Sequence, residues 1–102
     1  MKFLTGSKLI YLLKIVKISS RSEPIPYGRA MEEFAELQVE CSKMARGQKR
    51  DKEFLEEISD AFFYILKLLF KHRLTLDSLI DYCILKTVKK FPEQIKEVNN
   101  GF

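Results

Sequence analysis

Apolar residues recur along the chain at spacings of three and four positions, which is typical of amphipathic helices. No segment shows the strict alternation of apolar and polar residues that a half-buried strand requires. The pattern is broken at Pro24 and Pro26, because proline favours extended backbone and cannot continue a helix. We expect the polar tail beyond Pro92 to be frayed or loosely attached. The sequence therefore predicts an all-α fold with four helices, over residues 5–19, 27–46, 52–72 and 76–91.

The ends of three predicted helices carry residues that favour capping. Gly47 stands where the second helix should end, and glycine readily adopts the left-handed backbone of a C-terminal cap. Asp51 and Thr75 stand just before the third and fourth helices, where a side chain can accept a hydrogen bond from a free backbone N–H. The loop between the second and third helices is short and basic. We therefore expect these two helices to pack antiparallel.

The third predicted helix is apolar almost all the way round its axis. Its main apolar face includes Ile58, Ala61 and Ile65, while Phe63 and Phe70 lie on the far side. A helix with this pattern is buried over most of its surface. Because the chain is small, we expect part of that surface to be buried between subunits, so that oligomerisation completes the helical bundle.

The composition is that of one soluble globular domain. The 102 residues are 46% hydrophobic and 31% charged, which is too apolar for disorder and too charged for a membrane protein. Within this single domain we distinguish an N-terminal helix and proline-containing linker (1–26), core helices (27–91) and a tail (92–102). The apolar run in residues 1–17 is interrupted by lysines and is too short to span a bilayer. We expect it to pack on the domain and expect no membrane partner, a membrane-surface helix being the alternative.

The two cysteines, Cys41 and Cys83, lie far apart in predicted helices. No neighbouring cysteine or histidine gives either of them the ligand spacing of a zinc site. We therefore expect a reduced, cytoplasmic protein in which both cysteines are small core residues. The single histidine, His72, stands near a helix end, and we interpret it as a surface residue.

Acidic side chains form one stripe on each of the two central helices. The net charge of +4 indicates an anionic partner, yet most acids lie between residues 32 and 60. At about 100° per residue, each stripe borders an apolar face, so antiparallel packing would let the carboxylates converge. The stripe on the second helix contains Glu33, Glu36, Glu40 and Lys43, and that on the third contains Glu53, Glu57, Asp60 and Tyr64.

Converging carboxylates repel one another and lose hydration, so they are costly unless a cation offsets their charge. Oxygen ligands favour Mg²⁺, with Mn²⁺ as the alternative. A single pair of acids on a helix is more often solvated surface than a metal site. Asp60 argues against that alternative, because it stands in mid-helix before an apolar run, where a carboxylate has low helix propensity and no capping role.

The acids also form two short motifs. Glu33-Phe-Ala-Glu36 has the form ExxE, and Glu57-Ile-Ser-Asp60 has the form ExxD on the next predicted helix. Together with their surroundings, they resemble the MazG-like all-α nucleoside triphosphate pyrophosphohydrolases, especially the small phage and bacterial members. The resemblance covers residues 29–70, extends to 90 and does not include 1–26. The segments that carry it are Met31-Glu-Glu-Phe-Ala-Glu-Leu, Ser42-Lys-Met-Ala-Arg-Gly and Leu55-Glu-Glu-Ile-Ser-Asp-Ala.

The resemblance implies a four-helix MazG-like bundle that assembles as a homodimer or homotetramer. It implies Mg²⁺-dependent hydrolysis of a ribo- or deoxyribonucleoside triphosphate to the monophosphate and pyrophosphate, in keeping with nucleotide-pool housecleaning. Phosphoribosyl-ATP pyrophosphohydrolase and dimeric dUTPase-like activities are neighbouring possibilities, and the resemblance does not fix the base. The implied metal ligands are Glu33, Glu36, Glu57 and Asp60.

Further residues are expected around this metal site. Glu36 or Glu40 could accept a proton from the attacking water. Lys43 and Arg46 match basic positions of the family pattern and would contact phosphate, although cations also favour a helix C-terminus without any ligand. Lys86 resembles a lysine in related proteins and is a candidate for contacting phosphate or base.

Two alternatives to an enzyme follow from the same sequence. The first is a non-catalytic helical module that retains the fold and serves oligomerisation or protein interaction. The second is a nucleic-acid binder that uses the N-terminal lysines and the basic loop near residues 46–52. The chain carries no helix-turn-helix or zinc signature, so we expect no nucleic-acid partner.

Overall fold

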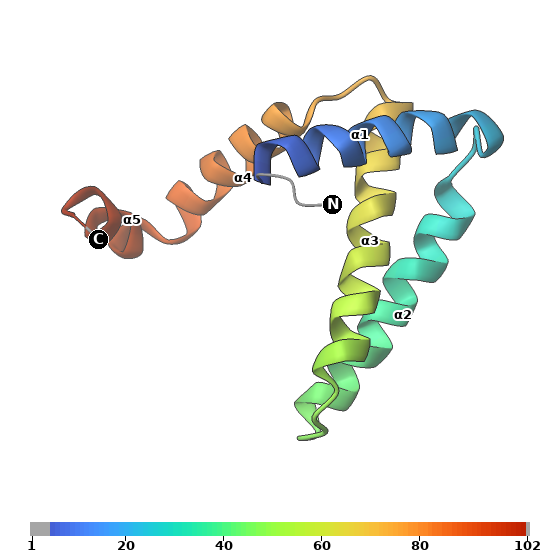
Figure 1. The fold of residues 1–102 in the computed structure, drawn as a ribbon. Helices are drawn as coiled ribbons and strands as arrows, with labels where there is room; N and C mark the ends of the chain where they lie inside the picture. The colour runs from blue at the N-terminus through green and yellow to red at the C-terminus, as the bar shows by residue number, and fades with distance from the viewer. Residues whose placement is uncertain (1–4, 102) are drawn as a thin grey trace.

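The computed structural model describes residues 5–101, and over this range the chain forms helices and no strand (Figure 1). The all-α fold class is therefore confirmed. The described part of the chain contains five helices rather than the expected four. They are α1 (Thr5–Ser22), α2 (Tyr27–Ala45), α3 (Asp51–Lys71), α4 (Leu76–Lys90) and α5 (Pro92–Asn99).

Helices α2 and α3 form the antiparallel hairpin that the short loop predicts (Figure 1). Gly47 follows α2 with a positive φ of 85°, which only glycine adopts at little cost. Two backbone bonds close the helix end: the Gly47 N–H donates to the Met44 carbonyl at 3.0 Å, and the Gln48 N–H donates to the Lys43 carbonyl at 3.2 Å. The expected glycine cap is thus confirmed, and it turns the chain back so that α3 lies against α2.

Helix α1 crosses α3 near its C-terminal end, as Figure 1 shows. The most buried apolar side chains of this contact are Val16 and Leu66, each 2% exposed. The linker to α2 contains Pro24 and the buried Pro26, and it carries the chain from the end of α1 to the start of α2. The expectation that the N-terminal helix packs on the domain is confirmed for the described residues.

Helices α4 and α5 lead away from the hairpin and pack chiefly against each other (Figure 1). Thr75 caps α4 as expected, because its side chain accepts the Ser78 N–H at 3.1 Å. The expectation of a frayed tail is wrong in one respect, since residues 92–99 are helical. Proline ends a preceding helix but is also favoured in the first turn of a new one, where its missing N–H is not needed. Pro92 therefore starts α5.

Two local expectations are wrong. Arg50, not Asp51, occupies the N-cap position of α3. Asp51 is the first helical residue, where its negative charge still interacts favourably with the helix dipole. Cys41 and Cys83 are exposed rather than core residues. The reason for Cys83 is that α4 buries none of its residues within this chain. His72 is exposed, as expected, and its ring lies 2.8 Å from the Tyr27 hydroxyl.

Much of the apolar surface of the single chain is exposed to solvent. On α4 alone, Ile80, Tyr82 and Ile84 are each about half or more exposed. Leu55, Ile58 and Phe62 on α3 are also open. Single apolar residues on a surface are ordinary, but whole helices with an uncovered apolar face are not.

None of the described helices combines the length and apolarity needed to cross a bilayer.

Candidate metal centre

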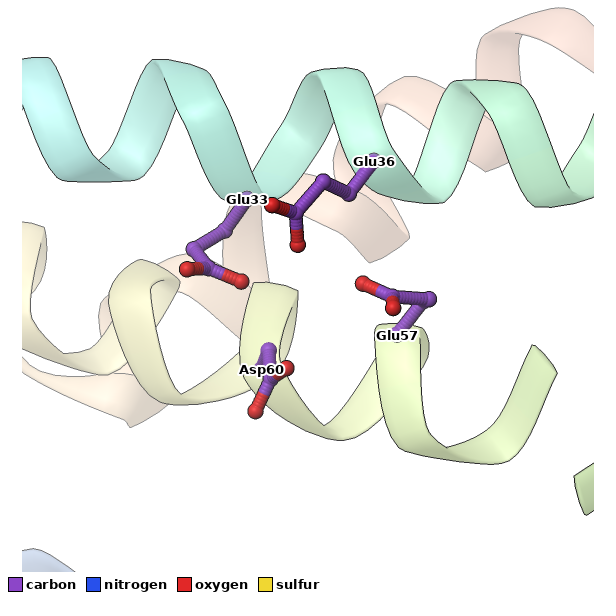
Figure 2. A group of neighbouring side chains, drawn as sticks. All are labelled: Glu33, Glu36, Glu57 and Asp60. Atoms are coloured by element: carbon purple, nitrogen blue, oxygen red, sulfur yellow. The ribbon is translucent and has the colours of Figure 1, made fainter. Parts of the chain in front are cut away.

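Four carboxylates from α2 and α3 converge on the hairpin. Glu33 and Glu36 come from α2, and Glu57 and Asp60 come from α3; one oxygen from each lies within 4.8 Å of those of the other three. Figure 2 shows the carboxylates of Glu33, Glu36 and Glu57 between the two helices, with Asp60 on the neighbouring turn of α3. The structure thus brings together the four acids for which the sequence predicts a shared site.

Two oxygen atoms of this cluster are buried without a hydrogen-bond partner: Glu33 Oε2 and Glu57 Oε2. The other oxygen of Glu33 accepts a bond from Arg29 Nη2 at 3.1 Å. Glu33 is only 6% exposed, whereas Glu36 and Asp60 are open to solvent. Buried polar atoms in native proteins almost always have a partner, so two unpaired carboxylate oxygens in one cluster make these four residues a candidate site for a cation.

The electrostatics of the cluster agree with this geometry. Burial raises the pKa of Glu33, and the neighbouring charges of Glu36 and Asp60 raise it further against the opposing effect of Arg29. Burial likewise raises the pKa of Glu57, with Glu36 as the next cause. Both shifts mean that ionising these carboxyl groups is less favourable in the fold than in water. A bound cation would reverse the balance, and carboxylate oxygens are ligands that suit Mg²⁺ or Mn²⁺.

Glu40 does not belong to this cluster. Arg50 donates two hydrogen bonds to the Glu40 carboxylate, from Nε to Oε2 and from Nη2 to Oε1, each 3.0 Å long. Lys43 Nζ adds a weaker contact at 3.6 Å from Oε1. The bonds from Arg50 hold the pKa of Glu40 below its ordinary value. Glu40 thus ties the loop after α2 to that helix through Arg50, a partner that the sequence pattern missed.

Of the other predicted site residues, Lys43 and Arg46 lie at the end of α2 and Lys86 lies on α4. Lys43 stands at the loop end of α2, held by Glu40, and Arg46 is exposed at the C-cap of the same helix. Both belong to the hairpin that carries the cluster. Lys86 does not, because it lies on α4 and lines a cavity of about 430 Å³ together with Tyr82 and Cys83.

A second charged network was not anticipated. Lys67 is 2% exposed in the middle of the apolar segment of α3. Its Nζ donates to Glu23 Oε1 at 2.5 Å and to Ser19 Oγ at 3.1 Å, and the Tyr64 hydroxyl donates to Glu23 Oε2 at 3.2 Å. The only sequence signal was a lone charge within Tyr-Ile-Leu-Lys-Leu-Leu, since a buried lysine requires a partner. This network ties the α1–α2 linker to α3.

In comparisons with known proteins, no protein family, curated protein or solved structure matches the chain.

Proposed function

We propose that the chain is a Mg²⁺-dependent nucleoside triphosphate pyrophosphohydrolase, which converts an NTP or dNTP to the nucleoside monophosphate and pyrophosphate. The observation that carries this proposal is the convergence of four carboxylates from two helices, with two buried oxygens lacking a partner. The reaction itself is suggested by the resemblance of the ExxE and ExxD motifs to the MazG-like family. The helical hairpin that presents the four acids supports the fold which that resemblance implies.

The cluster's donors are suited to a hard divalent cation. Glu33, Glu36, Glu57 and Asp60 would hold Mg²⁺, or Mn²⁺ in its place, and the exposed side of the cluster leaves room for phosphate. When bound, the metal would supply positive charge to phosphate oxygens and make coordinated water more acidic. Arg29 holds Glu33 in place from the side away from the unpaired oxygen. The chain's own part is thus to orient the oxygens in advance of binding.

Of the two candidates for the general base, the structure favours Glu36. A base needs a free oxygen within reach of the water that it deprotonates. Both oxygens of Glu40 are engaged by Arg50, and its lowered pKa makes it a poor proton acceptor at neutral pH. Glu36 is exposed and lies in the cluster. In this proposal Glu40 supports the site by anchoring Arg50 and Lys43.

Lys43 and Arg46 are proposed to contact the phosphates, because they lie on the same helix as Glu36 and toward the loop. A chain of three phosphates extending from the metal along the hairpin would meet their charges in turn. Lys86 could take part only through a neighbouring subunit or a rearranged α4, since that helix packs away from the hairpin.

We further propose that the active form is a homodimer or homotetramer. Helix α4 buries no residue in the single chain, and its apolar side chains need a cover that other subunits can supply. The same assembly would shield the exposed apolar residues of α3, including Leu55 and Phe62.

The decisive experiment measures monophosphate and pyrophosphate released from a panel of NTPs and dNTPs in Mg²⁺. Glu57→Gln and Asp60→Asn should each abolish turnover, while circular dichroism and oligomer size stay unchanged. Glu56→Gln is the matched control, because Glu56 is an exposed glutamate beside Glu57 that lies outside the cluster. Absence of turnover for every nucleotide would refute the activity. Full activity in either cluster variant would refute the metal assignment.

A non-catalytic helical oligomerisation module is the second candidate. The uncovered apolar faces of α3 and α4 favour it, because they serve assembly whether or not the chain is an enzyme. It predicts that the unmodified chain hydrolyses no nucleotide and that Glu57→Gln keeps the oligomer size of the unmodified chain.

A further inference from the structure

A second pocket lies where the α1–α2 linker meets the end of α3 and the start of α4. Its volume is about 670 Å³, which falls in the range of small-molecule sites in proteins. Apolar walls come from Pro24, Pro26, Phe70 and Leu74. The pocket therefore offers both space and an apolar surface, and its remaining lining consists of charged residues together with Ser20 and Thr75.

The charges in this pocket are mostly positive. Lys67, Lys71 and Arg73 line it, with Glu23 as the one acidic residue in the lining. The Glu23 charge is already balanced, because Lys67 binds it and the Tyr64 hydroxyl donates to it. Within the described part of the chain, neither Lys71 nor Arg73 makes an ion pair. Two cations thus remain for an anion from outside.

Arg73 occupies a position that normally selects glycine. Its φ is 55°, in the left-handed region, directly after the C-cap of α3. The Arg73 N–H donates to the Phe70 carbonyl at 3.1 Å, and the Leu74 N–H donates to the Leu69 carbonyl at 2.9 Å. This is the same closing pattern as at Gly47, where the chain does carry glycine. Arg73 therefore adopts this backbone conformation at a cost in free energy, and it does so in the wall of a cationic pocket.

We infer that this pocket binds a small organic phosphate. The phosphate would pair with Lys71 and Arg73, and the organic part would lie against Pro24, Phe70 and Leu74. The pocket is distinct from the carboxylate cluster, because Lys67 follows Asp60 by seven residues, roughly 10 Å along the helix. The nearly buried Tyr64 stands between them on α3. The inference does not depend on the proposed hydrolysis.

The test is calorimetric titration with AMP, CMP, GMP and UMP, and with inorganic phosphate, in EDTA. Without a metal the acidic cluster repels phosphate, so binding reports the cationic pocket. At least one monophosphate should bind more tightly than inorganic phosphate, because the apolar walls contact the nucleoside. Lys71→Ala and Arg73→Gly should each weaken that binding roughly tenfold, the effect of losing one charge-assisted contact.

The variants separate binding from folding. Arg73→Gly relieves the left-handed strain, so its melting temperature should not fall even though its affinity does. Lys89→Ala removes an exposed lysine of α4 outside this pocket, and Glu57→Gln alters the metal cluster; both should bind like the unmodified chain. The inference is overturned if no monophosphate binds below about 1 mM. It is also overturned if Lys71→Ala and Arg73→Gly bind normally, or if Glu57→Gln loses the ligand.

Discussion

Replacing Lys67 by methionine tests whether the buried network holds the α1–α2 linker on α3. Methionine has a similar shape and is apolar, so Lys67→Met keeps the packing and removes the charge. Lys67 is 2% exposed, and the change leaves Glu23 without its main partner. Breaking a fully buried pair costs about 3–5 kcal/mol. Because the Glu23 side chain is 28% exposed, hydration of its carboxylate offsets part of this cost in free energy.

We therefore expect Lys67→Met to lower the free energy of unfolding by about 2 kcal/mol, which for a domain of this size lowers the melting temperature by roughly 8–16 °C. Urea unfolding at pH 7 measures the first quantity and a thermal scan the second. The double variant Glu23→Gln/Lys67→Met should recover most of the loss, since no unpaired charge remains.

The pH dependence provides a second readout of the same pair. The hydrogen bond from Lys67 lowers the pKa of Glu23 from 4.5, so the pair's stabilisation is present above that value. It is lost as the pH falls through the lower, folded-state pKa. Lys67→Met should therefore reduce the loss of stability on acidification below pH 4.5. A single variant as stable as the unmodified chain, or a double variant no more stable than the single one, would show that the buried pair does not hold the linker on α3.

Three further outcomes are expected. Burial raises the folded-state pKa of Glu33 and Glu57 above 4.5, so the metal-free protein should lose stability as the pH rises from 4.5 through those values. Adding Mg²⁺ should restore the stability at pH 7. Thermal scans with and without Mg²⁺ check this, and a metal-free stability that does not change with pH would contradict it. Glu40→Gln should lower the melting temperature, because Arg50 loses its charged partner. The Mg²⁺ affinity measured by calorimetry should stay unchanged. A loss of Mg²⁺ affinity in this variant would place Glu40 in the metal site. Light scattering at micromolar concentration should show an oligomer, whereas a stable monomer would remove the interface interpretation of α3 and α4.

The sequence predicted the hairpin and its acids well, because local rules govern both. Helical periodicity placed Glu33 and Glu36 on one stripe and Glu57 and Asp60 on another, and Gly47 marked the turn that brings the stripes together. These features depend only on helix geometry and backbone preference. The structure adds the burial of Glu33 and the unpaired oxygens, which depend on packing.

Contacts between distant segments could not be predicted in this way. Lys67 is buried because Glu23, 44 residues earlier, reaches it from the linker. Glu40 looked equivalent to Glu36 on the stripe, but Arg50 returns from the loop and occupies both of its oxygens. Helical spacing contains no information about such partners. Cys83 was misjudged for a related reason, since the apolar pattern of α4 does not reveal that this helix buries none of its residues within the chain.

The Gly47 turn also sets the alignment of the two halves of the metal cluster. Glu36 and Glu57 stand at nearly equal distances in sequence from Gly47, and so do Glu33 and Asp60, which is why each acid faces one from the other helix (Figure 2). One residue inserted after Gly47 would displace α3 by about 1.5 Å and rotate it by about 100°, unless the loop absorbed it. The length of a loop that lies about two helical turns from the nearest acid of the cluster therefore determines whether the four acids stay in register.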